Sequence, residues 1–169
     1  LLFVFLTASV VFAQDSSDVR MVSRVYDYWH TTYGVDVQGD YAYVATGLSG
    51  LQIVDISNRE EPAVVGVWET RLGPGGVVVS GDIACVSLRD TASMIAILNI
   101  SDPTQPEVVG KIDSLGWGGM DEYVSEMWIQ DNALFAASWI GLYIFDLTDL
   151  AEPKQLARLG VCLIVTLFS

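Results

Sequence analysis

The sequence predicts an all-β protein, namely a β-propeller fragment with three four-stranded antiparallel blades and an orphan N-terminal strand. One pattern occurs three times, as LQIVDISNREEP at 51–62, IAILNISDPTQP at 95–106 and LYIFDLTDLAEP at 142–153. Its closing prolines, Pro62, Pro106 and Pro153, lie 44 and then 47 residues apart. A period of about 40–50 residues built from short strands indicates a propeller. The apolar runs are also too short for helices.

Each repeat begins, before this pattern, with two apolar strands joined by a tight turn. The turn dipeptides are Gly39-Asp40, Gly81-Asp82 and Asp131-Asn132, which are residue types that tolerate the positive φ of a hairpin. A third strand then ends at a Ser/Thr–Pro corner, and an outer strand follows the proline. Four strands in sequence make one blade. We therefore expect blades at 35–68, 76–112 and 125–159, within a propeller region spanning 35–160.

Residues 1–13 are predicted to be a signal peptide whose basic n-region is missing. The run from Leu1 to Val11 is apolar and uncharged, and Val11-Phe12-Ala13 places small residues before a polar stretch. The alternatives are a membrane anchor and a core helix, but a membrane span needs about 20 apolar residues and this run is shorter. The prediction is therefore an exported protein, located outside the cell, in the periplasm or on the cell surface, with no membrane span in the fragment.

Residues 14–34 are expected to hold an orphan outer strand at Val19–Tyr26. Its Val-Ser-Arg-Val-Tyr26 and the polar loop after it match Val-Gly-Val-Trp68 and the loop that follows that strand. Since propellers have about four to eight blades, three do not close a ring. We expect completion by missing blades, with 161–169 as a truncated C-terminal tail; pairing with a second copy of the chain is the alternative.

The repeat also carries a more specific signature. Leu51-Gln-Ile-Val-Asp55 is followed by Ile-Ser-Asn, and Gly39-Asp40-Tyr-Ala-Tyr-Val-Ala45 precedes it. This pattern resembles the repeat of the LVIVD family of secreted or surface propeller proteins of bacteria and archaea, over about residues 19–160. The later copies depart from it, with Met94 and Asn99 in the second copy and Asp131-Asn132 and Ala157 in the third. The resemblance implies a propeller at or outside the cell surface, and it implies no particular chemistry.

The composition excludes several classes of function. The chain has a formal net charge of −13, which disfavours nucleic acid and anionic lipid as partners. His30 is the single histidine, so the chain has no cluster of histidines to bind zinc. A catalytic triad that needs a histidine would have to use His30. Of the two cysteines, Cys85 and Cys162, Cys85 is expected to be a buried free thiol within a strand. We predict no catalytic residue, no metal site and no cofactor.

Carboxylates and amides recur where the third strand of each repeat ends. These residues are Asp55, Asn99 and Asp146, followed three positions later by Asn58, Asp102 and Asp149. A calcium site would need several oxygens converging from one loop. Asp, Asn, Ser and Thr at strand ends more commonly accept hydrogen bonds from the following turn. Because the pattern is present in every repeat, we interpret these residues as architectural.

The loops that differ between repeats are the better candidates for function. The strand order places the loops between outer and inner strands, and those between second and third strands, on one face. The candidate ligand-binding residues on this loop face are Arg89, Asp90, Trp117, Asp121, Glu122 and Trp139. Exposed aromatics beside carboxylates suit sugars and peptides alike.

The prediction is an exported, non-catalytic repeat module for protein or glycan binding or scaffolding at or outside the cell surface. The alternative is a secreted propeller enzyme acting on polysaccharide, with Asp90 paired to Asp121 or Glu122 as its two carboxyl groups. A purely structural repeat within a larger surface protein is also open.

Overall fold

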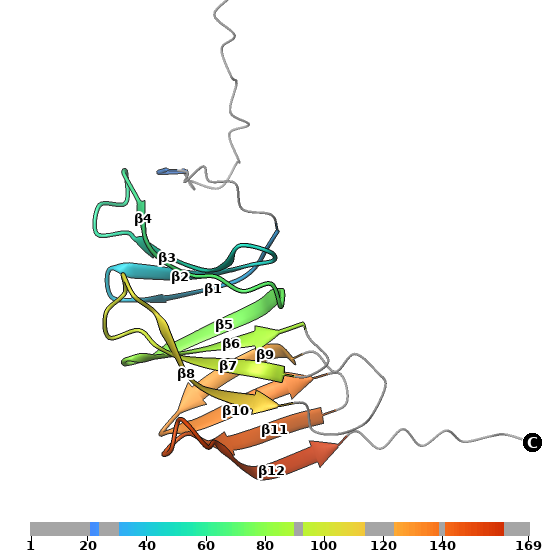
Figure 1. Cartoon of the computed structure of the whole chain (residues 1–169). Coiled ribbons are helices and arrows are strands. Elements are labelled where there is room, and N and C mark those ends of the chain that lie inside the picture. The colour runs from blue at the N-terminus through green and yellow to red at the C-terminus, as the bar shows by residue number, and fades with distance from the viewer. Residues whose placement is uncertain (1–20, 24–30, 90–92, 114–123, 139–140, 161–169) are drawn as a thin grey trace, which may run out of the picture.

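The computed structural model describes residues 21–23, 31–89, 93–113, 124–138 and 141–160 (Figure 1). These residues form twelve strands and no helix. The strands make three separate four-stranded antiparallel sheets, each in the order of the chain. The predicted fold class, an all-β protein with three four-stranded blades, is confirmed.

The first blade contains β1 (Thr32–Gln38), β2 (Tyr41–Thr46), β3 (Gly50–Asp55) and β4 (Ala63–Trp68). The second contains β5 (Pro74–Ser80), β6 (Ile83–Leu88), β7 (Ser93–Asn99) and β8 (Glu107–Asp113). The third contains β9 (Val124–Gln130), β10 (Ala133–Ser138), β11 (Gly141–Asp146) and β12 (Lys154–Gly160). In the first two blades the inner strand begins earlier than expected, because pairing continues past an irregularity to Thr32 and Pro74.

Two kinds of tight turn join the first and second strands of the blades. Gly39 and Gly81 have φ of +60° and +57°. A positive φ at the first turn residue alone matches a type II′ turn, which favours glycine there. In the third blade both Asp131 and Asn132 have positive φ, at 49° and 61°, as in a type I′ turn. The substitution in the third repeat thus changes the turn type while keeping a two-residue hairpin.

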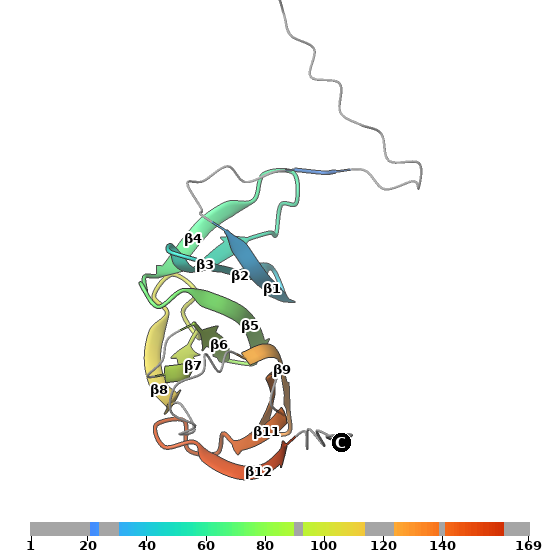
Figure 2. The same ribbon diagram turned by 90° about the vertical axis from the view of Figure 1, so that its right-hand side faces the viewer.

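The blades stack face to face, with the first and third blades at opposite ends of the stack (Figures 1 and 2). The inner strands β1, β5 and β9 contact one another in succession. The side-chain amide of Gln38 in β1 adds a link to the turn that follows β5, since it donates to the carbonyl of Gly81 at 2.8 Å and accepts from its N–H at 2.9 Å. The arc of three blades is not closed into a ring by the described residues.

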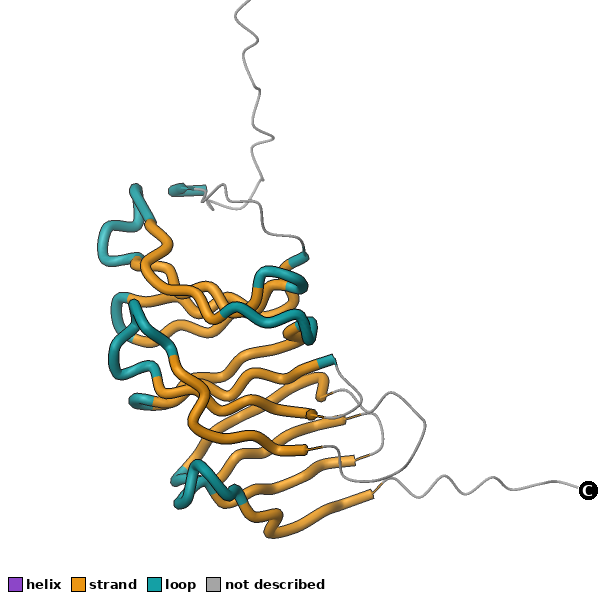
Figure 3. The backbone as a smooth tube through the Cα atoms, viewed as in Figure 1, coloured by secondary structure: helices purple, strands orange, loops and turns teal. Residues whose placement is uncertain are grey.

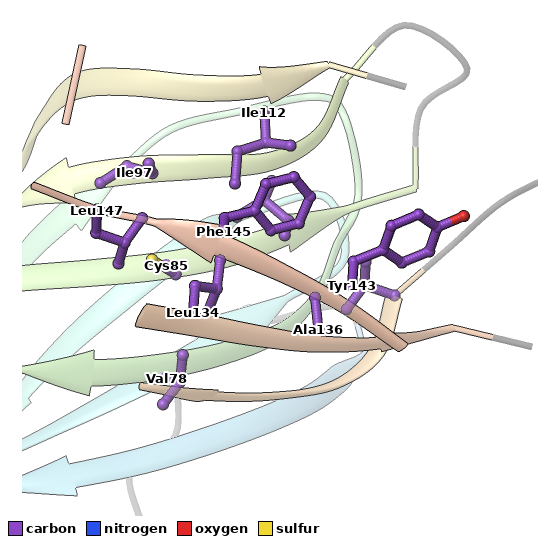
Figure 4. Packing of buried hydrophobic residues seen from close by; sticks show 11 residues of the cluster. Val78, Cys85, Ile97, Ile112, Leu134, Ala136, Tyr143, Phe145 and Leu147 are labelled. Atoms are coloured by element: carbon purple, nitrogen blue, oxygen red, sulfur yellow. The ribbon is translucent and has the colours of Figure 1, made fainter. Parts of the chain in front are cut away.

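Two apolar clusters lie between the blades. The cluster between the first and second blades contains Tyr43, Leu51, Ile53, Ala84, Val86, Leu88, Ala96, Leu98 and Ile100. The cluster between the second and third blades contains Val78, Cys85, Ile95, Ile97, Ile112, Val124, Leu134, Ala136, Tyr143, Phe145 and Leu147 (Figure 4). The second blade therefore contributes apolar residues to both clusters.

The side chains of strand β6 pack on both faces of the second blade, which explains why the sequence of this strand is a continuous apolar run. Ala84 and Val86 pack toward the first blade, while Cys85 between them packs toward the third. A strand buried on both faces has no polar face and so shows no alternation. Among the described residues, no helix has the length and apolar character needed to cross a bilayer.

Candidate functional site

The connections between strands gather at two opposite ends of the stack (Figure 3). The end that we call the corner end carries the two-residue turns and the Ser/Thr–Pro corners at 56–62, 100–106 and 147–153. The other, which we call the loop end, carries the described loops 47–49 and 69–73 together with Arg89. The loop end is where the sequence predicts ligand binding.

The first polar residue of each corner accepts a hydrogen bond from within its own turn. Asp55 Oδ1 accepts from the N–H of Ser57 at 2.8 Å, and Asn99 Oδ1 accepts from the N–H of Ser101 at 2.9 Å. Asp146 accepts from both the N–H and the hydroxyl of Thr148. This geometry is an Asx turn, and an amide oxygen serves as well as a carboxylate.

The second polar residue of each corner is engaged in the same way. Asn58 Oδ1 accepts from the N–H of Glu60 at 3.1 Å, and Asp149 Oδ1 accepts from the N–H of Ala151 at 3.1 Å. Asp102 Oδ1 accepts from the N–H of Thr104 at 2.9 Å and from its hydroxyl at 2.7 Å. The repeated carboxylates and amides of the corner end therefore hold turns, as the sequence predicted.

These hydrogen bonds stabilise the ionised carboxylates of the corner end. The hydroxyl and then the N–H of Ser57 lower the pKa of Asp55, and those of Thr104 do the same for the pKa of Asp102. The pKa of Asp146 is lowered chiefly by the hydroxyl of Thr148. Each donor favours the charged form because it bonds to the carboxylate. Within the described part of the chain, no three His, Cys, Asp or Glu residues lie together as a metal site would require.

Cys85 lies in the apolar cluster between the second and third blades and is fully buried as a free thiol. Burial raises the pKa of Cys85 to about 12, because a thiolate is poorly stabilised in apolar surroundings. The expected buried free thiol is confirmed for Cys85. Cys162 lies outside the described residues.

The loop end brings together an aromatic ring and a guanidinium from different blades. The Arg89 guanidinium lies over the Tyr33 ring, with 5.0 Å between its central carbon and the ring centroid. Tyr33 belongs to β1 of the first blade and is 47% exposed, while Arg89 directly follows β6 of the second blade. This is a cation–π contact at the surface, where two adjacent blades meet.

Backbone hydrogen bonds hold Arg89 and the chain that precedes Tyr33. The N–H of Arg89 donates to the carbonyls of Leu72 and Gly73 at 3.1 and 3.2 Å, and the N–H of Gly47 donates to the carbonyl of Thr31 at 2.8 Å. A Cβ at Gly47 would lie 3.3 Å from the Tyr33 ring, so glycine lets the loop approach the aromatic closely. Leu48, which follows Gly47 in the chain, is 64% exposed.

A second polar feature lies close to Arg89 along β6. Ser87 is 1% exposed, and its hydroxyl oxygen has no hydrogen-bond partner among the residues that the structure describes. A Cβ at Gly75 would lie 3.1 Å from that oxygen and 3.7 Å from the Arg89 side chain. A buried hydroxyl without a partner is unusual in folded proteins. Within the described part of the chain, the Ser87 hydroxyl thus keeps unused hydrogen-bonding capacity, whereas the corner residues described above use theirs within their turns.

Of the six predicted site residues, the structure describes Arg89 alone. The others, Asp90, Trp117, Asp121, Glu122 and Trp139, lie outside the described residues, as does His30. Tyr33 and Ser87 were not predicted from the sequence as site residues. Tyr33 closes the aromatic stretch Tyr28-Trp-His-Thr-Thr-Tyr33, which was a usable signal, whereas nothing in the sequence distinguishes Ser87 from other strand serines.

Comparisons with known proteins agree with this architecture. The LVIVD repeat family matches residues 31–70 and 75–114, which cover the first two blades. None of the curated proteins matches the sequence.

Several solved structures are similar in fold, and three of them illustrate the likeness. The computationally designed Ika4 protein has a TM-score of 0.62 at 8% identity, over 85% of this chain and 81% of that one. The computationally designed Ika8 protein has a TM-score of 0.56 at 8% identity, over 76% of this chain and 36% of that one. The β-propeller domain of Cps50 (Swd1) from Myceliophteria thermophila also has a TM-score of 0.56, at 16% identity, over 78% of this chain and 43% of that one. At such low identity the likeness concerns the fold alone.

Proposed function

Because the chain belongs to the LVIVD-repeat β-propellers, we propose that it is an exported, non-catalytic module that binds a protein or glycan through its loop end. In this proposal the stacked blades are a rigid scaffold. The loops on one end of it differ from repeat to repeat and provide the contact surface. Such a division between scaffold and loops is common among binding proteins.

The observation that carries the proposal is the contrast between the two ends. At the corner end, Asp55, Asp102 and Asp146 are held by hydrogen bonds within their own turns. At the loop end, an exposed tyrosine ring and a guanidinium lie together across a blade boundary. Polar groups already bonded within the chain have less to offer a ligand than groups at the surface of a blade boundary.

The Tyr33–Arg89 pair has the chemistry of a recognition surface. Tyrosine has a large apolar ring with a polar hydroxyl, and the arginine guanidinium has several N–H donors in one plane. Both residue types are enriched at protein interfaces. The ring can also stack on the apolar face of a sugar. A cationic group on a chain with net charge −13 favours a ligand with a carboxylate or other acidic group at this point.

Export is part of the proposal and is supported by the sequence. The apolar run that ends at Ala13 has the layout of a signal peptide. The strongly acidic remainder is compatible with a protein that must stay dissolved at a surface rich in other macromolecules.

The experiment is a binding screen against a glycan array and a panel of purified cell-surface proteins, followed by variants of the pair. Arg89→Ala and Tyr33→Leu should each weaken the binding of any hit at least about tenfold, a typical loss for a central contact. Tyr33→Phe keeps the ring and should bind normally. Arg59→Ala removes an exposed arginine from the corner end and is the charge-matched control.

The outcomes separate the two ends of the molecule. Loss of binding with Arg89→Ala but not with Arg59→Ala supports a site at the loop end. A hit that tolerates Arg89→Ala and Tyr33→Leu but is lost with Arg59→Ala would place the site at the corner end and contradict the proposal.

A further inference from the structure

The inner strand of the second blade contains a β-bulge made of two glycines. The register of β5 against β6 shifts between Pro74 and Val77. Gly75 and Gly76 therefore both lie opposite a single residue of β6, Ser87. Bulges of this kind are common beside functional sites, where they re-aim a side chain. We call these three residues, Gly75, Gly76 and Ser87, the glycine bulge.

The hydroxyl of the glycine bulge is directed at its two glycines. A Cβ at Gly75 would lie 3.1 Å from Ser87 Oγ, and a Cβ at Gly76 would lie 3.4 Å from it. Both glycines are partly exposed, whereas Ser87 is buried, and its hydroxyl has no partner among the residues that the structure describes. Glycine allows a ligand to approach the backbone closely. A slender polar group lying on these glycines would therefore reach a buried hydroxyl that is otherwise unbonded within the described chain.

The neighbouring blades carry side chains where the second blade has Gly75. The counterpart of Gly75 is Tyr33 in the first blade and Ser125 in the third. The hydroxyl of Ser125 donates to the carbonyl of Ala137 at 3.0 Å, and Ala137 is the counterpart of Ser87. A side chain thus uses this position within the third blade. The second blade differs in having a buried hydroxyl with only glycine backbone in front of it.

The glycine bulge adjoins the cation–π pair of the loop end. A Cβ at Gly75 would lie 3.7 Å from Arg89 Cγ, so one small group at this place would contact both Arg89 and Ser87. The Arg89 guanidinium in turn lies over the exposed ring of Tyr33. A hydroxyl, a cation and an aromatic ring therefore follow one another along this surface. Hydroxyl and guanidinium groups both donate to carboxylates, and an aromatic ring packs on the apolar face of a sugar.

We propose that the glycine bulge, together with Arg89 and Tyr33, binds a single uronate residue of an otherwise neutral glycan. This inference rests on the proposed function and names its ligand class. The carboxylate lies on the two glycines and accepts hydrogen bonds from Ser87 Oγ and the Arg89 guanidinium, while the sugar ring packs against Tyr33. An acidic peptide side chain has the carboxylate but lacks the apolar ring face. The net charge of −13 opposes a polyanion, which favours one carboxylate among neutral sugars.

NMR titration of the full chain with methyl β-glucuronoside tests the site, with methyl β-glucoside as the matched neutral sugar. We expect a dissociation constant on the order of 1 mM for the glucuronoside, typical of a ligand of this size. The amide signals of Gly75, Gly76 and Ser87 should shift, and the glucoside should bind at least about fivefold more weakly. Arg89→Gln should abolish this preference. Ser87→Ala should weaken glucuronoside binding about fivefold, as expected for one lost hydrogen bond.

A second variant and a control complete the test. Gly75→Ala places a methyl group 3.1 Å from Ser87 Oγ and should also weaken binding, with its melting temperature measured to establish that it folds. Ser80→Ala removes an exposed hydroxyl from the same strand and should bind like the wild type.

Two results would overturn the proposal. One is the absence of glucuronoside binding at about 20 mM, well above the expected dissociation constant. The other is wild-type affinity in both Ser87→Ala and Gly75→Ala. If either result occurs while a hit from the binding screen still depends on Arg89 and Tyr33, the proposed function stands and the uronate site alone is wrong.

Discussion

The carboxylate of Asp36 accepts a hydrogen bond from the backbone N–H of Val79 across the boundary between the first two blades, at 2.8 Å. Its other oxygen accepts from the N–H of Val37 on its own strand, also at 2.8 Å. The backbone N–H of Val79 in β5 thus donates to a side chain of the preceding blade. The counterparts of Asp36 in the other repeats are Val78 and Trp128, so this link belongs to the first junction alone.

Asp36→Ala should lower the free energy of unfolding by about 1.5 kcal/mol, because it removes a charged acceptor and leaves the N–H of Val79 without that partner. Urea denaturation monitored by tryptophan fluorescence measures the change. Glu126→Ala removes an exposed carboxylate from the inner strand β9 and should change stability by less than about 0.5 kcal/mol. Equal effects of the two variants would show that the link across the blades contributes nothing.

Gly66→Ala should be among the most destabilising small substitutions in the chain. The added Cβ would overlap the carbonyl oxygen of Pro103, which is backbone and cannot move aside without separating the blades. Overpacking of this kind costs about 3 kcal/mol. A matched control is Gly76→Ala, whose Cβ would lie 3.4 Å from its nearest neighbour, Ser87 Oγ. If both variants unfold at the same urea concentration, the first two blades are not interlocked at Gly66.

Acidification should destabilise the corners, and an amide substitution should remove part of that sensitivity. Hydrogen bonds lower the pKa values of Asp55 and Asp146 in the folded chain below their usual value of 3.8. The unfolded chain therefore takes up protons first, so the stabilisation is complete above about pH 5 and is lost as the pH falls through the folded pKa values. Asn99 shows that an amide supports the same turn.

The measurement is the melting temperature from about pH 7 to about pH 2.5. The double variant Asp55→Asn with Asp146→Asn should melt like the wild type at neutral pH and lose less stability in acid. Asp82→Asn with Asp131→Asn makes the same change in charge at two turn residues outside the corners. If both pairs follow the same curve, the corner hydrogen bonds are not the source of the acid sensitivity.

Cys85 should resist alkylation in the folded chain. Because burial raises its pKa to about 12, only about one thiol in ten thousand is ionised at pH 8, and reagent cannot reach it. Treatment with iodoacetamide at about pH 8 should leave the peptide containing Cys85 unmodified by mass spectrometry, and labelling should become complete in about 6 M guanidinium chloride. Labelling at the same rate with and without denaturant would mean that the cluster between the second and third blades opens readily.

The sequence by itself determined the blades and their turns, because these depend on residues close together in the chain. Gly39-Asp40 and Asp131-Asn132 specify two-residue hairpins through their tolerance of positive φ. Asp55 and Ser57 specify a corner through a hydrogen bond between residues that are two positions apart in the sequence. The spacing of Pro62, Pro106 and Pro153 then indicates the number of blades. Within each blade, four strands that follow one another in the chain pair with their neighbours.

Only the tertiary structure decided which residues meet between blades. Tyr33 contacts Arg89, Asp36 contacts Val79, and Ser23 contacts Arg59, over separations of 36 to 56 residues. These contacts depend on the offset and angle at which one twisted sheet packs on the next. That geometry arises from the summed packing of many apolar side chains in the two clusters, and no short sequence pattern specifies it.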